Sequence, residues 1–164
     1  MLPNDILSAA EALVRRMEAK GLTLATAESC TGGLVSAAVT EIPGSSNVLL
    51  AGYVTYSNAA KSDLLAVDPG LIERHGAVSA EVARAMAEGA LDRSGASFAV
   101  SITGIAGPGG ATATKPVGLV HFALARKAAP CVNESRNFAG LNRSGVRLEA
   151  VRTALRLIAD AIAA

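Results

Sequence analysis

Hydrophobic residues change their spacing along the chain, from a helical period to strand-like runs and back. Apolar residues recur every three or four positions across residues 5–19, with charged residues between them, and Gly21 follows. This pattern predicts an amphipathic helix that ends at a glycine. Leu148 and the apolar residues after it, as far as Ile162, keep the same period, with arginines off the stripe. They predict a long C-terminal helix with one buried face.

Shorter segments between these helices predict the rest of the fold. Strands are expected at residues 22–27, 48–56 and 97–103, and a hairpin at 117–126 and 131–138. Helices are expected at residues 33–41, 58–65 and 69–75, and Ser79 is a good N-cap for a helix that runs to about Ser94, before Gly95. This alternation predicts an α/β fold: a single three-layer α/β/α domain over residues 1–164 with a mixed, mostly parallel sheet. The pattern does not define the strand order.

The composition narrows the class of ligand. The chain has 164 residues, of which 51% are hydrophobic, enough to build the core of one domain. Its 15 basic and 14 acidic side chains nearly cancel, and only 3% of residues are aromatic. These values argue against a nucleic-acid partner or an anionic membrane surface and favour a small molecule. An Ala-rich surface and an exposed sheet edge would suit a homodimer or a larger homo-oligomer.

The cysteines and histidines form no metal or disulfide pattern. Cys30 and Cys131 are far apart in sequence, and both His75 and His121 are distant from them. We therefore expect reduced cysteines, no metal site and a cytoplasmic protein without an export signal or membrane span. His75 is expected to cap the end of a helix, and His121 to be a hydrogen-bonded residue of a strand.

The segment Ala-Glu-Ser-Cys-Thr-Gly-Gly at residues 27–33 is the first candidate for chemistry, because it joins an expected strand to an expected helix. Ser29 is a candidate nucleophile whose oxyanion would be held by amides at the helix N-terminus, while Gly32 and Gly33 would let a substrate approach the backbone. Cys30 is the rival nucleophile if a base or a positive field lowers its pKa. A purely structural interpretation is equally open: the polar residues here would cap the helix.

A second polar segment, Tyr-Val-Thr-Tyr-Ser-Asn-Ala-Ala-Lys at residues 53–61, follows another apolar run. Lys61 can act as a general base if burial lowers its pKa, and Tyr56 can relay a proton or donate to an oxyanion. If Asn58 caps the next helix, Lys61 projects from the first turn of that helix. The alternatives are a solvated surface lysine and a tyrosine that packs across strands.

The glycine-rich segment 104–110 follows a strand but matches neither the Walker nor the dinucleotide-binding fingerprint. It can wrap a phosphate or a ring through its amides, or it can be a plain connection. Arg143 and Arg147 lie four residues apart, on one face if helical, and could hold a phosphate. Their alternative role is a solvated start of a helix.

Six blocks in this order resemble the CinA C-terminal domain family over nearly the whole chain. They are Ala-Glu-Ser-Cys-Thr-Gly-Gly (27–33), Ile-Pro-Gly-Ser-Ser (42–46), Tyr-Val-Thr-Tyr-Ser-Asn-Ala-Ala-Lys (53–61), His-Gly-Ala-Val-Ser (75–79), Thr-Gly-Ile-Ala-Gly-Pro-Gly-Gly (103–110) and Lys-Pro-Val-Gly (115–118). The resemblance implies a nicotinamide-nucleotide amidohydrolase that converts nicotinamide mononucleotide to nicotinic acid mononucleotide and ammonia, in pyridine nucleotide salvage. No metal or organic cofactor is expected.

Transferred onto matching positions, the resemblance implies a nucleophile at Ser29 assisted by Tyr56 and Lys61. Family members often carry Gly-Asp-Arg-x-x-Val-Arg before the last helix; here both arginines are kept, but Leu141 is inserted and Asn142 replaces the aspartate. Some members have an additional N-terminal domain, which we do not expect in 164 residues, so its activities are not transferred. The residues expected to contact substrate are Glu28, Cys30, Thr31, Gly32, Gly33, Thr103, Gly104, Gly107, Gly109 and Arg143.

Two other functions fit the same sequence. One is a nucleotide-binding or regulatory domain that keeps the cleft but has no turnover. The other is an amidohydrolase that acts on a different pyridine or amide substrate, because loop geometry sets the specificity.

Overall fold

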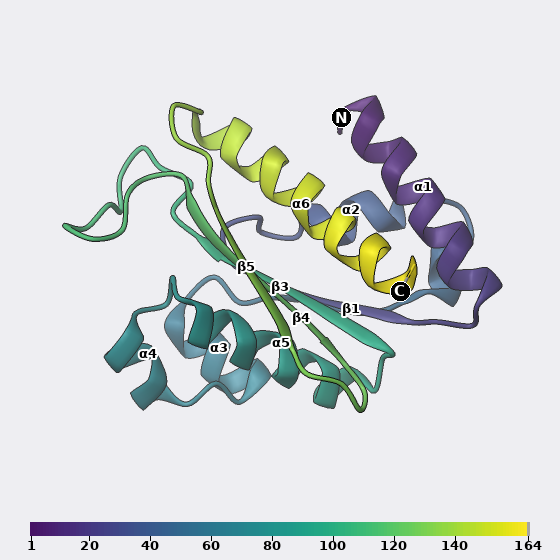
Figure 1. The fold of residues 1–164 in the computed structure, drawn as a ribbon, viewed down its shortest axis with the longest axis horizontal. Helices are drawn as coiled ribbons and strands as arrows, with labels where there is room; N and C mark the ends of the chain where they lie inside the picture. The colour runs from purple at the N-terminus through teal and green to yellow at the C-terminus, as the bar shows by residue number, and fades with distance from the viewer. Residues whose placement is uncertain (164) are drawn as a thin grey trace.

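The computed structural model describes residues 1–163 and consists of one mixed sheet between two layers of helices (Figure 1). The strand order is β2-β1-β3-β4-β5. Strands β2, β1 and β3 are parallel, β4 is antiparallel to β3, and β5 is antiparallel to β4. The strands are β1 (Leu24–Glu28), β2 (Leu49–Val54), β3 (Phe98–Gly104), β4 (Leu119–Arg126) and β5 (Val132–Asn137).

Helices cover both faces of the sheet. One layer holds α1 (Asn4–Ala19), α2 (Leu34–Thr40) and α6 (Arg143–Ala163), which share the larger core with the sheet. The other holds α3 (Asn58–Leu65), α4 (Pro69–His75) and α5 (Ala80–Ser94), packed on alanines of β1 and β3. A 3₁₀ turn, Ser45–Asn47, precedes β2. The predicted three-layer α/β/α fold with a mixed, mostly parallel sheet is confirmed.

The strand order places β1 at the centre of the parallel part of the sheet. The chain passes from β1 through α2 to β2 on one side, and returns through α3, α4 and α5 to β3 on the other. Loops that follow β1 therefore diverge from those that follow its neighbours. Such a switch point leaves a crevice at the carboxyl ends of the strands.

Caps set the starts of the helices on the second layer. Ser79 caps α5 as predicted, since its hydroxyl accepts from the Val82 N–H at 3.2 Å. The cap of α3 is Ser57, whose hydroxyl accepts from the Ala60 N–H at 3.0 Å. Asn58 is thus the first residue of the helix rather than its cap, and its side chain is not used to hold the helix end.

Helix α3 is held close to α5 by one glycine. A Cβ on Gly89 of α5 would lie 2.0 Å from the carbonyl oxygen of Leu65, at the end of α3. No side chain fits in that space, so the two helices touch along their backbones. This contact fixes the position of α3, which carries Lys61.

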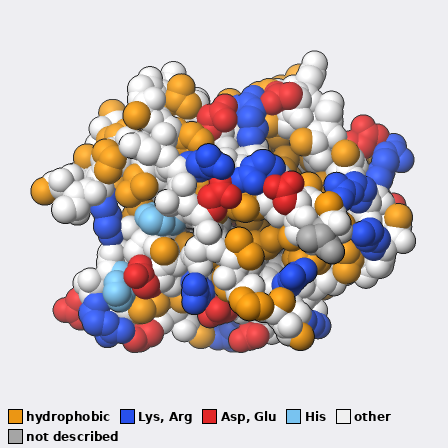
Figure 2. Space-filling model, in the orientation of Figure 1, with side chains coloured by type: hydrophobic (Ala, Val, Ile, Leu, Met, Phe, Trp, Pro, Cys, Tyr) orange, Lys and Arg blue, Asp and Glu red, His pale blue; other side chains and the backbone are white. Residues whose placement is uncertain are grey.

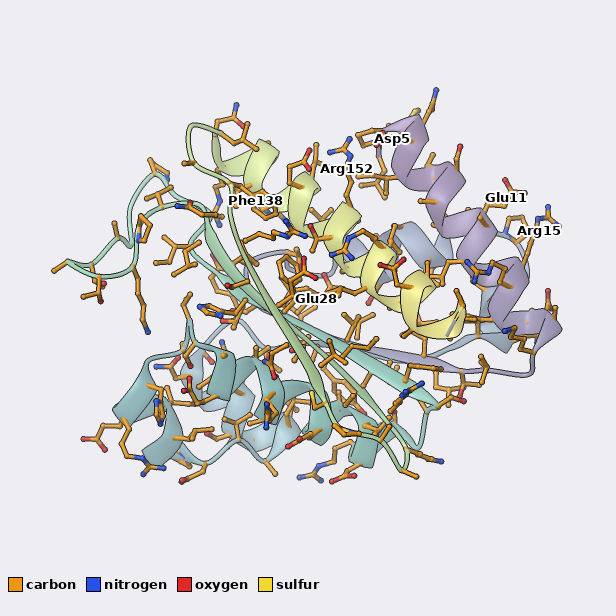
Figure 3. All side chains as sticks on the ribbon, viewed as in Figure 1. Asp5, Glu11, Arg15, Glu28, Phe138 and Arg152 are labelled. Atoms are coloured by element: carbon orange, nitrogen blue, oxygen red, sulfur yellow. The ribbon has the colours of Figure 1, made fainter. Side chains whose placement is uncertain are left out.

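The surface mixes both signs of charge. Figure 2 shows acidic and basic side chains interspersed over one face. In Figure 3, Arg152 of α6 points toward Asp5 of α1, and the two form an ion pair. Across residues 1–163, no helix is both long enough and apolar enough to pass through a membrane.

A buried carboxylate organises the junction between β1 and α2. Glu28, labelled in Figure 3, is fully buried. Its two oxygens accept from the N–H groups of Gly33, Val35 and Ser36 at 2.9–3.1 Å, and from the Ser36 hydroxyl at 3.1 Å. The first amides of a helix have no partner within the helix, and a carboxylate is the acceptor that suits them best. Glu28 therefore caps α2 from the preceding strand.

We expect Glu28→Gln to lower the free energy of unfolding by about 1–3 kcal/mol, because the glutamine NH₂ would face N–H donors and leave them unpaired. Urea unfolding followed by circular dichroism measures this loss. Glu11→Gln is the matched control: Glu11 is exposed and pairs only with Arg15 on its own helix, so its loss should stay below about 0.5 kcal/mol. Equal effects of the two substitutions would contradict the capping role.

Candidate active site

A cleft of about 260 Å³ opens at the carboxyl ends of β1, β2 and β3, where the crossovers diverge. Its walls come from four parts of the chain: the segment after β1, the β2–α3 turn, the segment before α5 and the glycine-rich loop after β3, with one residue of α6. The lining residues are Ser29, Cys30, Tyr56, Asn58, Lys61, Ala77, Val78, Thr103, Gly104, Ile105, Ala106, Gly107, Gly109, Gly110 and Arg143.

Ser29 is the first residue after β1. Its N–H still donates to the Ile102 carbonyl of β3 at 2.9 Å, so its backbone is held by the sheet. Its hydroxyl accepts from Nζ of Lys61 at 3.1 Å. The capping interpretation of this segment is confirmed for Glu28, which accepts from the amides at the start of α2, and is wrong for Ser29, whose hydroxyl contacts Lys61.

Lys61 lies in the first turns of α3 and is only 1% exposed. Besides Ser29, its Nζ donates to the carbonyl oxygens of Thr55 at 2.8 Å and of Tyr56 at 3.4 Å. Among residues 1–163, no carboxylate forms a salt bridge with it. Burial lowers the pKa of Lys61 below its ordinary value of 10.5. More of the side chain is therefore a neutral amine near pH 7, which can accept a proton from Ser29.

Cys30 also lines the cleft, but its thiol is a poor nucleophile. Burial raises the pKa of Cys30 to about 12, so the thiol stays protonated near neutral pH. The amides of α2 give it no help because Glu28 occupies them, and burial outweighs the positive charges of Arg147 and Lys61, which lower this pKa. The sequence leaves both Ser29 and Cys30 as candidate nucleophiles, and the raised pKa of Cys30 favours Ser29.

Tyr56 contacts Lys61 through its backbone carbonyl, whereas its side chain lies at the cleft. Its backbone carbonyl accepts from Lys61, whereas its side chain is largely exposed and its hydroxyl accepts from Nη2 of Arg143 at 2.9 Å. Within the described chain, no hydrogen bond joins the phenol to Ser29 or to the Lys61 amine. The phenol belongs to the rim of the cleft rather than to its base.

The glycine-rich loop after β3 forms another wall of the cleft. Arg143 donates to the Gly107 carbonyl at 2.8 Å and so ties this loop to α6. Gly107 has φ +80°, and a Cβ there would lie 2.5 Å from a methyl group of Val117. Thr103 donates its hydroxyl to the Ala77 carbonyl at 2.8 Å, which links the end of β3 to the segment before α5.

Four residues expected to contact substrate lie outside the cleft lining: Glu28, Thr31, Gly32 and Gly33. Glu28 caps α2, and Thr31 is fully buried. Gly32 and Gly33 adopt φ +60° and +97°, which the turn between β1 and α2 requires. Arg147 also lies outside the lining; its guanidinium donates to the carbonyls of Cys30 and Thr31.

Several lining residues were not among the sequence candidates: Asn58, Ala77, Val78, Ile105, Ala106 and Gly110. Ala77 and Val78 belong to the block His-Gly-Ala-Val-Ser, which carried the family resemblance without a role. Asn58 was interpreted as a helix cap, and with Ser57 in that position its amide is free to face the cleft. Both segments had thus been noted in the sequence, although neither had been assigned a role in binding substrate.

The histidines lie in separate places. His75 is the last residue of α4, as expected, and its carbonyl accepts from Lys115 at 2.6 Å. His121 is half-buried on β4, and burial lowers its pKa. Over residues 1–163, no three His, Cys, Asp or Glu side chains are grouped so that they could share a metal ion.

Known proteins share this sequence and fold. The sequence model of the CinA C-terminal domain matches residues 6–162. A CinA-like protein of Mycolicibacterium vanbaalenii is 54% identical over 142 residues, 87% of this chain and 33% of that protein. A CinA-like protein of Chlorobium phaeovibrioides is 48% identical over 156 residues, 93% of this chain and 36% of that protein. The chain thus spans about a third of the length of these curated relatives.

Two solved structures match over almost their full length. The competence/damage inducible protein CihA from Agrobacterium tumefaciens has a TM-score of 0.96 and 46% identity, covering 100% of this chain and 99% of that one. A competence-damaged protein (CinA) superfamily protein from Escherichia coli has a TM-score of 0.90 and 37% identity, covering 97% and 92%. On the family match and these relatives together, the chain belongs to the CinA C-terminal domain family.

Proposed function

We propose that the chain is a serine amidohydrolase that hydrolyses the carboxamide of nicotinamide mononucleotide to nicotinic acid mononucleotide and ammonia. The observation that carries this proposal is the contact between Nζ of Lys61 and Oγ of Ser29, 3.1 Å apart in a cleft. A base and a nucleophile within hydrogen-bond reach are what acyl transfer requires. The substrate and its place in pyridine nucleotide salvage come from the family resemblance.

In the first half-reaction, Ser29 Oγ forms a bond to the carboxamide carbon while its proton passes to the neutral amine of Lys61. The carbonyl π electrons move to oxygen, giving a tetrahedral oxyanion. When this adduct collapses, the C–N bond breaks and Lys61 returns the proton to the departing nitrogen, which leaves as ammonia. The Tyr56 phenol accepts from Arg143 at the rim of the cleft, so no proton transfer is assigned to it.

In the second half-reaction, water attacks the acyl-serine ester. Lys61 accepts the proton of the water and then returns it to Ser29 Oγ as the ester C–O bond breaks. The product is the carboxylic acid, and the enzyme regains its starting state. One lysine thus serves as base and acid in both halves, and the cycle needs no metal or organic cofactor because these residues carry every proton.

The charges around the cleft support an anionic substrate. Arg143 is the guanidinium that lines it, and among residues 1–163 no acidic side chain does. Arg143 lies at the rim, exposed, where a phosphate remote from the reacting amide would reach it. A guanidinium is well suited to bind phosphate oxygens. Nicotinamide mononucleotide carries both the amide and such a phosphate.

A binding domain without turnover would have little use for Lys61. Burying a lysine without a carboxylate partner is costly, and a binding site gains nothing from a lowered pKa. A perturbed pKa in a cleft is instead typical of catalytic groups. The burial of Lys61 therefore favours an enzyme over a regulatory domain.

The nucleophile is tested with two adjacent substitutions. Ser29→Ala should lower kcat for ammonia release by about 10³-fold or more, because no acyl-enzyme can form. Cys30→Ser should keep most of the wild-type rate, since the protonated thiol takes no part. Ammonia is measured in a coupled assay, with the thermal midpoint of each variant as a check on folding. The opposite result, activity that survives the Ser29→Ala change and is lost with Cys30→Ser, would make cysteine the nucleophile.

The pH profile tests the base. Only the neutral amine of Lys61 accepts a proton, so kcat/KM should rise with pH and level off above a pKa lower than 10.5. Lys61→Arg should lose activity at every pH from 6 to 10, because a guanidinium stays charged throughout that range. Lys127→Met, a change at an exposed lysine of the β4–β5 turn, is the control and should keep the wild-type profile. A flat wild-type profile would contradict the assignment of Lys61.

Arg143 is tested by comparing nicotinamide mononucleotide with nicotinamide riboside and nicotinamide, which lack the phosphate. Arg143→Met should lower kcat/KM for the mononucleotide by about 10- to 100-fold relative to the other two, the loss expected for a hydrogen bond to a charged group. Equal losses on all three substrates would instead mean that Arg143 acts by holding Gly107 and Tyr56. Thermal stabilisation by the mononucleotide without ammonia release from any of the three would support the binding-domain alternative.

A further inference from the structure

Arg147 holds the segment that follows Ser29, although it lies outside the cleft lining. It sits on α6 one turn after Arg143 and is half-buried. Its Nε donates to the Cys30 carbonyl at 3.1 Å, and its Nη2 donates to the Thr31 carbonyl at 2.9 Å. Within residues 1–163, no carboxylate forms a salt bridge with Arg147. Its guanidinium donates to these two carbonyls instead.

Two hydrogen bonds, of which Arg147 makes the second, fix the orientation of the 29–30 and 30–31 peptide planes. The Ser29 carbonyl accepts from the Gly32 N–H at 3.1 Å, and the Cys30 carbonyl accepts from Arg147. Both peptide bonds are trans, and in a trans peptide the N–H points opposite to the C=O. The N–H groups of Cys30 and Thr31 are therefore turned away from these partners. Neither of them has a backbone acceptor in the described part of the chain.

The reaction needs donors that the start of α2 cannot supply. Sequence reasoning placed the oxyanion at the helix amides, but Gly33, Val35 and Ser36 donate to Glu28. The N–H of the residue directly after a serine nucleophile is a recurrent oxyanion donor in hydrolases. Here that residue is Cys30, which lines the cleft.

We propose that Arg147 is a positioning residue for catalysis: it holds the Cys30 and Thr31 carbonyls out of the cleft, so that neither carbonyl oxygen faces the oxyanion that the Cys30 N–H receives. This inference rests on the proposed amide hydrolysis at Ser29. It separates Arg143 and Arg147, the first two arginines of α6, by role, since Arg143 faces the cleft and Arg147 acts behind it.

An arginine suits this task because its planar fork binds two adjacent carbonyls at once. The Leu34 N–H also donates to the Thr31 carbonyl, at 3.3 Å, but among residues 1–163 the Cys30 carbonyl accepts from Arg147 alone, and the buried Thr31 hydroxyl has no hydrogen-bond partner. Without the guanidinium, the 30–31 peptide can rotate and turn a carbonyl oxygen toward the developing negative charge. The cost then appears in the transition state, where the charge develops, and not in substrate binding.

The test compares Arg147→Met with Arg147→Lys, and uses Arg152→Met as the matched control. Arg152 lies on the same helix but pairs with Asp5 and Glu149, away from the cleft. Two readouts are measured below the melting temperature of every variant: kcat and KM for ammonia release, and the rate at which a fluorophosphonate labels Ser29, followed by intact mass. The second readout depends on the oxyanion site but not on the natural substrate.

Arg147→Met should lower kcat and the labelling rate together, by about 100-fold, with KM within about threefold of wild type. Arg147→Lys, which keeps the charge but holds one carbonyl at a time, should lose less, and Arg152→Met should lose neither rate. A raised KM with unchanged kcat would overturn the inference, since Arg147 would then bind substrate. An unchanged labelling rate would reduce Arg147 to a structural role.

The two proposals fail in different ways. If the wild type is labelled at Ser29 but releases no ammonia from any pyridine carboxamide, the proposed function fails and the labelling rates alone decide the role of Arg147. If the wild type is not labelled at all, Ser29 is not an activated nucleophile, and both proposals are overturned.

Discussion

The burial of the Lys61 amine is the constraint on which the site depends. An amine removed from water must donate its protons to nearby acceptors, and here these are the Ser29 hydroxyl and the carbonyls of Thr55 and Tyr56. Ser29 follows β1, the two carbonyls follow β2, and the lysine comes from α3. One side chain therefore joins the ends of two parallel strands to the helix that leaves them. The close contact of Gly89 with Leu65 keeps that helix in place.

Two adjacent residues at the end of β1, Glu28 and Ser29, have different roles. Capping of α2 and stabilisation of an oxyanion would both use the amides at the start of α2. Side chains alternate between faces along a strand, so Glu28 points toward α2 while Ser29 points toward Lys61. The carboxylate takes the N–H groups at the start of α2 and stabilises the helix, but it also removes them from catalysis. A helix N-terminus that looks like an anion site in the sequence is thus already occupied. In the proposed mechanism, the N–H that stabilises the oxyanion therefore belongs to the peptide directly after Ser29.

Sequence reasoning recovered the elements but not their arrangement. The helices and strands were predicted because apolar period and caps are local, and Ser79 and Gly95 mark the ends of α5 as expected. The strand order was not, since it depends on which face each crossover takes, and the switch point that forms the cleft follows from that order. At the site, residue types indicated Ser29, Tyr56 and Lys61. Contacts between distant segments, such as Arg143 with the Tyr56 phenol and Glu28 with α2, have no local signal.

The same lysine that we propose as the catalytic base weakens the fold. Its pKa is lowered in the folded protein, so between that pKa and 10.5 the unfolded chain binds more protons than the folded one. Stability then falls as the pH drops through this interval, because protonation favours the unfolded state. An apolar side chain of similar length would fill the space beside Ser29 without this penalty. A protein selected only for stability or for ligand binding has no reason to keep a buried amine beside Ser29. A serine hydrolase, in contrast, needs a base that is uncharged and shielded from water. The position of Lys61 is best understood as a cost to folding that the chemistry at Ser29 requires.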